Sequence, residues 1–401
     1  MPLKGNAVVG QSGGPTAVIN ASLAGVIEEA LEHAEIQGVY GGVHGVLGML
    51  REDFIDLGKQ DPSVIRRLRA TPSAALGSCR HKVSPEDCAR LVEIFKKYDI
   101  RYFFYIGGND SADTSNKVSK AAKEAGYELA VVAVPKTIDN DLAVTDHSPG
   151  YGSVARWVAT AVRDAGLDTE AIGVVDNVKV IEVMGRNAGW ITAATVLARD
   201  HEDAAPHLVY LPERPFNPEK FLADVKAVYD RLGHCVVTVC EGLKDEAGRY
   251  VTASSRSIDT DKFGHKQLGG VGEFLCDLVA TNLKIKARCD KPGTIQRVSA
   301  ALASPVDVAE AYEVGRYAVR CAIQGVLDKM VVITRKPGPT YEVDFGTCDL
   351  AIVANAEKHV PSEFISEAGN DVTEAFIEYA LPLIGGPLEP YARLKRVAVR
   401  A

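Results

Sequence analysis

The sequence contains no run of about 18 apolar residues, the length that a helix needs to cross a membrane, so we expect no transmembrane segment and no membrane partner. Its first ten residues, MPLKGNAVVG, enter an apolar strand pattern at once, and we expect no secretory signal peptide. The eight cysteines form no Cys-x-x-Cys pair, and the nine histidines show no zinc-binding spacing. We therefore expect reduced thiols in a cytoplasmic protein without a zinc site.

An excess of positive charge is also absent, because 45 lysines and arginines stand against 53 aspartates and glutamates, which gives a net charge of −8. This balance disfavours a dedicated nucleic-acid-binding protein, which usually carries a basic face. It does not exclude an anionic substrate, since a basic cleft can exist on an acidic protein. With 401 residues, 46% of them hydrophobic, the chain is long enough for two or three packed domains.

Short apolar runs alternate with helical patterns along most of the chain, which is typical of an α/β fold with parallel sheets. The runs that predict strands lie at residues 7–11, 37–40, 102–106, 129–134, 178–183, 208–211, 235–240 and 330–334. The patterns that predict helices lie at 17–31, 85–97, 112–125, 153–165, 190–198, 218–232, 272–287 and 307–324. Ser84 with Asp87 forms a capping box, and Asn217 precedes a proline suited to the first helical position. We expect residues 336–346 to form a surface excursion.

Three loops that follow predicted strands carry residues suited to phosphate or metal binding. The first contains Gly13 and Gly14 just before a helix, where glycine allows an anion to approach the backbone. It fits neither the Walker pattern nor the dinucleotide fingerprint, and a tight strand-to-helix turn is the alternative interpretation. Because ligands bind at the carboxyl ends of parallel strands, we expect all three loops to lie at one site.

The second loop has the sequence GGNDS, and the third has the sequence PKTIDND. In the second loop the oxygens of Asn109 and Asp110 suit either Mg²⁺ binding or the capping of the following helix. In the third loop Lys136 supplies a cation, and Asp139 and Asp141 share one side if the segment is extended. One of these carboxylates could then act as a base and the other could bind a metal. The alternative interpretation is an acidic surface loop exposed to solvent.

Together these motifs resemble the 6-phosphofructokinase family, and the resemblance runs from about residue 6 to about residue 335. The segments that carry it are SGG at 12–14, LGSCR at 76–80, GGNDS at 107–111, PKTIDND at 135–141, EVMGR at 182–186, Glu241 after a strand, and IQR at 295–297. The resemblance implies two doubly wound, Rossmann-like α/β domains with the active site in the cleft between them. Residues 1–150 plus about 295–335 are expected to bind the phosphoryl donor, and residues 151–294 plus about 336–401 the sugar phosphate.

The resemblance also implies a reaction, in which a phosphoryl group passes reversibly from pyrophosphate to the 1-hydroxyl of fructose 6-phosphate, a glycolytic and gluconeogenic step. Asp139 is expected to be the base, with Lys136, Asp110 and Arg80 as further catalytic residues. The substrate-binding residues that it implies are Gly13, whose N–H would face pyrophosphate, Thr137, Ile138, Asp139, Met184, Gly185, Arg186, Glu241, Arg288, Thr294 and Arg297. Arg288 and Arg297 are the candidates for the 6-phosphate, and Mg²⁺ is expected at Asn109, Asp110 and Asp141.

Two positions bear on the choice of phosphoryl donor. In the family, the ATP-using branch typically has glycine where this chain has Asp110 and Lys136, and the pyrophosphate-using branch has aspartate and lysine. The aspartate at position 110 would also collide with the α-phosphate of ATP and repel it. Three departures from the family pattern, Asn109, Thr294 and Asn177, leave open whether Asn109 contacts the metal directly and whether subunits share a site.

Two alternatives are an ATP-dependent 6-phosphofructokinase and a catalytically silent subunit that binds sugar phosphate. Intact Asp139, Asp141 and Arg186 disfavour the silent subunit. Because relatives in the family form homodimers or homotetramers, we expect this chain to form a homo-oligomer as well.

Overall fold

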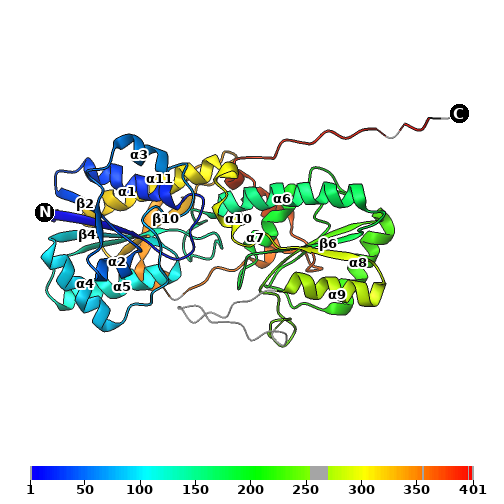
Figure 1. Cartoon of the computed structure of the whole chain (residues 1–401), viewed down its shortest axis with the longest axis horizontal. Coiled ribbons are helices and arrows are strands. Elements are labelled where there is room, and N and C mark those ends of the chain that lie inside the picture. Colours follow the sequence, from blue (N-terminus) through cyan, green and yellow to red (C-terminus); the bar gives the residue numbers. More distant parts are fainter. Residues whose placement is uncertain (1, 253–269, 355, 396, 400–401) are drawn as a thin grey trace.

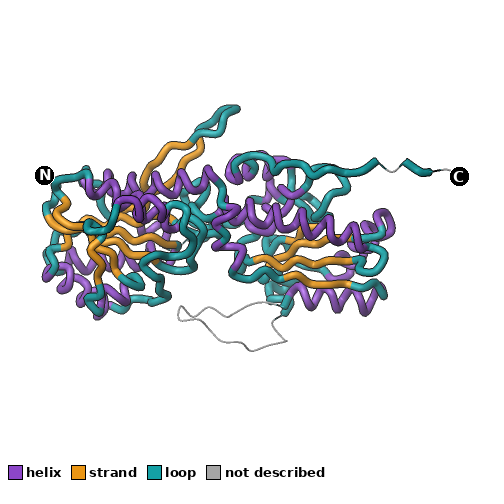
Figure 2. Tube along the Cα trace, turned by 45° about the horizontal axis from the view of Figure 1, so that its top comes forward, coloured by secondary structure: helices purple, strands orange, loops and turns teal. Residues whose placement is uncertain are grey.

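The computed structural model describes residues 2–252, 270–354, 356–395 and 397–399. Two α/β units lie side by side along the long axis of the molecule, and each is built around one sheet (Figure 1). Helices cover both faces of both sheets (Figure 2), so the expected architecture of two doubly wound units is confirmed. The loops that carry the predicted motifs lie where the two units face each other.

The first unit contains a seven-stranded sheet in the order β11-β10-β5-β4-β1-β2-β3. Its strands are β1 (Gly5–Gln11), β2 (Ile36–Gly42), β3 (Phe54–Asp56), β4 (Ile100–Gly107), β5 (Ala130–Pro135), β10 (Lys329–Arg335) and β11 (Val343–Asp349). Pairing is parallel except at the two edges, where β3 and β11 are antiparallel to their neighbours. Because β1, β4 and β5 are adjacent and parallel, the loops after them meet at one edge of the sheet.

The helices of the first unit bury its sheet on both sides. One face packs against α1 (Ile19–Leu31), α3 (Pro62–Leu68) and α11 (Pro305–Ile323). The other face packs against α2 (Val46–Leu50), α4 (Pro85–Lys97), α5 (Asn109–Glu124) and α12 (Leu350–Val353). Side chains of β4 alternate between these two cores, with Tyr102 and Phe104 in one and Phe103 in the other, which explains why its sequence is continuously apolar.

The second unit contains a four-stranded parallel sheet in the order β7-β8-β6-β9. Its strands are β6 (Val178–Val183), β7 (Leu208–Tyr210), β8 (Cys235–Cys240) and β9 (Ala287–Asp290). One face packs against α6 (Tyr151–Ile172), α7 (Trp190–Ala194), the 3-10 helix η1 (Thr195–Ala198), α13 (Glu374–Ala380) and the 3-10 helix η4 (Pro382–Ile384). The other face packs against α8 (Pro218–Leu232) and α9 (Val271–Leu283). The remaining short helices are α10 (Ile295–Val298), η2 (Ala300–Leu302) and η3 (Ser362–Phe364).

Two helix starts follow the predicted capping chemistry. Ser84 and Asp87 form the expected capping box at the start of α4. At the start of α8, the side chain of Asn217 accepts a hydrogen bond from the backbone N–H of Lys220.

Two boundaries expected from the sequence differ from the structure. Helix α9 ends at Leu283, where Lys284 adopts a left-handed φ of 59°, and the chain then forms β9, so the predicted helix at 272–287 is too long. The segment after β10 was expected to leave the first unit near residue 335, but β11 continues the first sheet to Asp349. Only residues 336–342 of the expected excursion lie outside the strands, because β11 finds its partner in β10.

Candidate active site

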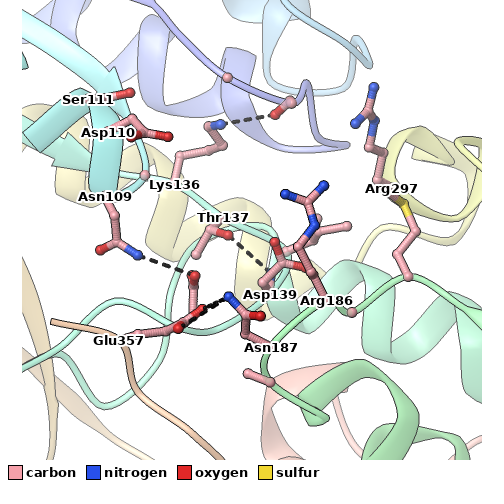
Figure 3. Close-up of a pocket in the computed structure, with 18 of the residues that line it drawn as sticks. Asn109, Asp110, Ser111, Lys136, Thr137, Asp139, Arg186, Asn187, Arg297 and Glu357 are labelled. Carbon is pink, nitrogen blue, oxygen red and sulfur yellow. Dashed lines mark hydrogen bonds between the residues drawn. The ribbon is translucent and has the colours of Figure 1, made fainter. Parts of the chain in front are cut away.

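A cavity of about 550 Å³ lies between the two units. The first unit contributes the loops after β1, β4 and β5, and the second contributes the loop after β6 and the end of β8 (Figure 3). The residues that line it are Ser12, Gly13, Gly14, Arg80, Gly108, Asn109, Asp110, Ser111, Lys136, Thr137, Ile138, Asp139, Asp141, Met184, Gly185, Arg186, Asn187, Ala188, Glu241, Arg297, Ala354, Ala356 and Glu357. The structure therefore brings together all of the predicted site residues except Arg288 and Thr294.

The loop after β1 is shaped to let two cations approach its backbone. A Cβ at Gly13, which has a φ of 77°, would lie 3.1 Å from the Nζ of Lys136. A Cβ at Gly14 would lie 2.9 Å from the Nη1 of Arg297. The N–H of Gly13 donates to the carbonyl oxygen of Cys79, 3.1 Å away, so it is occupied within the protein. This corrects the expectation that the N–H of Gly13 faces pyrophosphate.

Lys136 is the most enclosed cation of the cavity, with 3% of its surface exposed. Its Nζ donates to the carbonyl oxygen of Gly14 at 2.9 Å (Figure 3). Burial, reinforced by the positive charge of Arg297, lowers the pKa of Lys136 to about 8, while Asp139 acts in the opposite direction. The side chain therefore still carries most of its charge at neutral pH.

The loop after β4 presents polar side chains that do not serve as helix caps. Helix α5 has Gly108 as its N-cap residue and no side-chain cap, so the alternative capping role of Asn109 and Asp110 is not found. The Nδ2 of Asn109 instead donates to the Oδ2 of Asp141 at 3.2 Å. Asp110 lies in the first turn of α5, in the same part of the cavity as Lys136 (Figure 3).

The loop after β5 contains the two aspartates, and it is bent rather than extended. Asn140 between them adopts a left-handed φ of 53°. Its side chain donates to the hydroxyl of Tyr379 and accepts from the N–H of Ser148, and these bonds hold the bend. Both carboxylates still line the cavity, although the extended geometry assumed from the sequence is wrong.

Burial also shifts the protonation of the two aspartates. It raises the pKa of Asp139, the charge of Glu241 raises it further, and Lys136 acts against them. Burial raises the pKa of Asp141 as well, assisted by the negative charges of Asp139 and Glu357. Such crowding of carboxylates favours the binding of a cation or of a proton.

The oxygens around Asp141 fit Mg²⁺ when phosphate oxygens complete the coordination. The Oδ1 of Asn109 is buried and has no hydrogen-bond partner in the described part of the chain, and Asp110 and Asp141 line the same cavity. Among the described residues, no three histidine, cysteine, aspartate or glutamate side chains are grouped closely enough to hold a metal by themselves. Incomplete protein coordination of this kind is typical of Mg²⁺, which keeps waters and substrate phosphates as ligands.

The second unit supplies the opposite wall of the cavity. Arg186 follows β6, and its guanidinium points into the cavity near Asp139 (Figure 3). The N–H of Met184 donates to the side-chain oxygen of Gln296, which is 2% exposed, so this loop is anchored to α10. Burial raises the pKa of Glu241 at the end of β8, while Arg186 acts against it.

Two predicted site residues lie outside the cavity. Arg288 occupies an outward-facing position of β9, its side chain is 58% exposed, and its Nε pairs with Asp176 at 2.7 Å. Thr294 precedes α10 without lining the cavity. Strand β9 was not predicted from the sequence, and its alternation directs Arg288 away from the cleft of its own chain.

Sequence reasoning missed one charged residue of the site, Glu357. Both of its carboxylate oxygens accept from the Nδ2 of Asn187, at 3.0 and 3.4 Å (Figure 3). An isolated antiparallel bridge pairs Glu357 with Leu142, next to Asp141. The further lining residues without a predicted role are Ser12, Gly14, Gly108, Ser111, Asn187, Ala188, Ala354 and Ala356. Several of these adjoin predicted motifs, whereas nothing in the sequence around Glu357 signals a site.

The pattern of the phosphofructokinase family matches residues 6–322. The chain belongs to the phosphofructokinase family. Because the match covers more than half of the chain, the family predicted from the loop motifs is confirmed.

Comparisons with individual proteins extend the likeness over nearly the whole chain of this phosphofructokinase. It is 44% identical over 388 residues to the pyrophosphate–fructose 6-phosphate 1-phosphotransferase of Halomonas elongata, covering 95% of this chain and 92% of the relative. A crystal structure of the pyrophosphate-dependent phosphofructokinase of Nitrosospira multiformis matches with a TM-score of 0.88 and 42% identity, covering 99% of this chain and 98% of that one. A sulfofructose kinase of Alkalicoccus urumqiensis is 32% identical over 373 residues, which are 92% of this chain and 95% of the relative.

Among the described residues, no helix is both long and apolar enough to cross a lipid bilayer.

Proposed function

We propose that this phosphofructokinase transfers a phosphoryl group from pyrophosphate to the 1-hydroxyl of D-fructose 6-phosphate, giving fructose 1,6-bisphosphate and phosphate in a reversible reaction. The observation that carries this proposal is the position of Asp110 and Lys136 in one cavity beside the loop after β1. Full-length relatives at 44% identity that are named for this reaction support it.

Asp110 and Lys136 together favour a short donor over ATP. The carboxylate of Asp110 would meet the α-phosphate of ATP with like charge, and two unit charges about 4 Å apart near a protein surface repel by about 4 kcal/mol before screening. Lys136 offers compact positive charge to pyrophosphate, whose two phosphates lie close together. Discrimination between donors therefore uses both a repulsive and an attractive element.

Asp139 is assigned as the base that accepts the proton of the sugar hydroxyl. Its raised pKa brings the carboxylate closer to the basicity that suits this task at neutral pH. Phosphoryl transfer proceeds through a loose transition state in which charge neutralisation and positioning carry most of the rate. Lys136, Arg297 and Arg80 line the donor side of the cavity and are placed to neutralise that charge.

Asp141, Asp110 and the side-chain oxygen of Asn109 would hold Mg²⁺. The ion would neutralise charge on the phosphates when bound. The Nδ2 of Asn109 already donates to Asp141, and the Oδ1 of Asn109 has no hydrogen-bond partner among the described residues.

The sugar phosphate is assigned to the wall formed by the second unit, namely Met184, Gly185, Arg186 and Glu241, together with Thr137 and Ile138 of the loop after β5. Arg297 lies between this wall and the loop after β1, because its guanidinium approaches Gly14. We therefore assign Arg297 to the interface of the two substrates rather than to the sugar phosphate alone. The first unit is accordingly proposed to bind the donor and the second the acceptor.

A matrix of donors and acceptors tests this function. Purified protein would be assayed with pyrophosphate or ATP as donor, and with fructose 6-phosphate or sedoheptulose 7-phosphate as acceptor, at fixed Mg²⁺. We expect turnover with pyrophosphate and fructose 6-phosphate to exceed that of every ATP combination. A higher kcat/KM with ATP would replace the proposal by an ATP-dependent enzyme, and sugar binding without turnover would favour a silent subunit.

We also propose a cytoplasmic location and assembly into a homodimer or homotetramer. All eight cysteines, which lie in the described part of the chain, are free thiols, and seven of them are buried. Unpaired thiols suit a reducing compartment. Sedimentation velocity on the purified protein measures the assembly state directly.

A further inference from the structure

A short segment, residues 356–360, lines the cavity with Ala356 and Glu357 and contacts loops of both units. We refer to it as the strap. Toward the first unit, the N–H of Lys358 donates to the carbonyl oxygen of Asp141 at 2.8 Å. The ammonium group of Lys358 donates to the carbonyl oxygens of Asp146 and Thr145, at 2.7 and 3.1 Å. The strap is therefore anchored to the same loop that carries the two aspartates.

The strap is anchored to the second unit as well. The indole Nε1 of Trp190 donates to the carbonyl oxygen of Lys358 at 2.9 Å. The side chain of Asn187 donates to Glu357, and a ring nitrogen of His359 lies 3.1 Å from the carbonyl oxygen of Asn187. Three consecutive residues, Glu357, Lys358 and His359, thus connect the loops of the two units.

One carboxylate, that of Glu213, joins the strap to the loop after β6. Glu213 lies in the turn after β7 and does not line the cavity. Its Oε1 accepts from the N–H of Gly189 at 2.8 Å and from the N–H of Val360 at 3.0 Å. Gly189 ends the loop that begins at Met184, and Val360 ends the strap. A single oxygen atom therefore fixes the ends of two segments that line the cavity.

The local structure is adapted to this contact. A Cβ at Gly189 would lie 2.7 Å from the Oε2 of Glu213 and 2.8 Å from the Cδ of Pro212, so only glycine permits the approach. The Oε2 of Glu213 is buried and has no hydrogen-bond partner among the described residues. Burial also raises the pKa of Glu213. A carboxylate is costly to bury in this way, and such a cost in a folded protein calls for an explanation.

We propose that Glu213 is a positioning residue of the active site. By holding the loop at 184–189 and the strap together, it fixes the position of the wall assigned to the sugar phosphate. The proposal rests on the assignment of that wall to the sugar phosphate. The contact requires the length of the glutamate side chain rather than its charge, because one oxygen accepts both N–H groups and the other has no hydrogen-bond partner among the residues that the structure describes. Small displacements of a binding wall have large kinetic effects, since reacting groups must be held close to the reactive geometry.

Three substitutions at Glu213 distinguish the effect of side-chain length from the effect of charge. Glu213→Gln keeps the length and one acceptor oxygen but removes the charge, and we expect nearly wild-type kinetics. Glu213→Asp keeps the charge but shortens the side chain by one methylene, and Glu213→Ala removes the acceptor altogether. For both we expect kcat/KM for fructose 6-phosphate to fall about tenfold or more, with a much smaller change in KM for pyrophosphate.

A matched control is Asp61→Ala, which removes a carboxylate that also accepts a backbone N–H, at the start of α3 and away from the cavity. We expect it to lower Tm without changing either KM. If Glu213→Asp behaves like this control, or if Glu213→Gln is as impaired as Glu213→Asp, the positioning role is refuted. The pair of Asp and Gln variants decides the question even if Glu213→Ala does not fold.

Amide hydrogen exchange provides a readout that does not depend on activity. In Glu213→Asp we expect faster exchange in peptides that contain the N–H groups of Gly189 and Val360, and wild-type exchange in Glu213→Gln. Unchanged exchange at both segments in Glu213→Asp would contradict the proposal. If wild-type protein shows no pyrophosphate-dependent turnover, the proposed function fails, while the exchange data still decide whether Glu213 holds the two segments.

Discussion

The ammonium group of Lys136 donates a hydrogen bond to the carbonyl oxygen of Gly14, 2.9 Å away, and this bond joins the loop after β5 to the loop after β1. The cation is therefore held at the donor loop by the protein itself. A charge that is already in place needs no reorganisation when the phosphoryl group moves, which is the condition under which electrostatic stabilisation is most effective.

The lowered pKa of Lys136 predicts an alkaline limit to activity. Lys136 is charged below its pKa of about 8 and loses its charge above it. We expect kcat/KM for pyrophosphate to decrease as pH rises through this value, because kinetics at low substrate report the ionisation of the free enzyme. Lys136→Arg should remove this decrease, since a guanidinium stays charged, although its different shape should lower the overall rate. The measurement is a profile from about pH 6 to about pH 10, and an unchanged alkaline limb in Lys136→Arg would assign it to another group.

Asp139→Asn tests the assignment of the base. The amide keeps the shape of the side chain, so we expect folding and sugar binding to change little. Removal of the proton acceptor should lower kcat by at least about 10²-fold. Steady-state kinetics combined with calorimetric binding of fructose 6-phosphate measures both effects, and nearly normal turnover would exclude Asp139 as the base.

Asp110→Gly tests donor selection. Loss of the carboxylate should make room for the α-phosphate of ATP and remove the repulsion, so we expect ATP-dependent activity to rise from background while pyrophosphate activity falls. Adding Lys136→Gly should deepen the loss with pyrophosphate. The measurement is kcat/KM for both donors in the wild type and both variants at fixed Mg²⁺. No change for either donor in Asp110→Gly would refute the exclusion argument.

Arg297→Ala tests the position of Arg297 between the two substrates. Because the guanidinium approaches Gly14 and also has Arg80 as a neighbour, we expect a fall in kcat/KM for pyrophosphate as well as for fructose 6-phosphate. A charge-assisted contact with phosphate is typically worth about 1.5–3 kcal/mol, which corresponds to roughly 10- to 150-fold for each substrate. A fall in kcat/KM for fructose 6-phosphate alone would show that Arg297 binds only the 6-phosphate, as the sequence suggested.

A buried histidine predicts a pH dependence of stability. Burial by itself would lower the pKa of His147, but its hydrogen bonds to Asp146 and Glu310 outweigh this effect and raise the pKa above the ordinary value. Tyr341 also donates to Glu310, and Arg335 pairs with Asp146, so these groups surround the imidazole. The stabilisation is fully present below the unfolded pKa of about 6.5 and is lost as pH rises through the raised folded value.

His147→Gln should therefore lower Tm most at about pH 6, and the difference from wild type should shrink toward about pH 9. We expect a cost of about 1–3 kcal/mol at the acidic end, the scale for an unsatisfied buried polar partner. Scanning calorimetry at several pH values measures it. A difference in Tm that grows with pH would show that His147 is neutral in the folded protein.

The sequence was most informative where a motif follows a strand directly. Asp110, Lys136 and Asp139 line one cavity, as expected, because parallel neighbouring strands bring their carboxyl ends to one edge of a sheet. The sequence could not show that the N–H of Gly13 is bonded to Cys79, since that contact joins two loops 66 residues apart. It also could not show that Arg288 lies outside the cavity of its own chain, because the direction of a side chain on β9 depends on a strand that the local pattern did not reveal.

Glu357 and Glu213 were missed for a related reason. Neither belongs to a recognisable motif, and both acquire their positions through contacts with segments distant in the chain. Long-range packing of this kind is invisible to local periodicity. The residues with a proposed chemical role were therefore easier to find than those proposed to hold them in place.

The hydroxyl of Tyr379 in α13 accepts from Asn140 and donates to the carbonyl oxygen of Asp146, so it bridges the two ends of the aspartate loop. The loop follows β5 in the first half of the chain, whereas Tyr379 comes 239 residues after Asn140. Strands β1, β2, β4 and β5 are synthesised long before this hydroxyl, whereas β10 and β11, which complete the first sheet, precede it closely. The two hydrogen bonds that tie the ends of the aspartate loop together consequently form only after α13 has been synthesised.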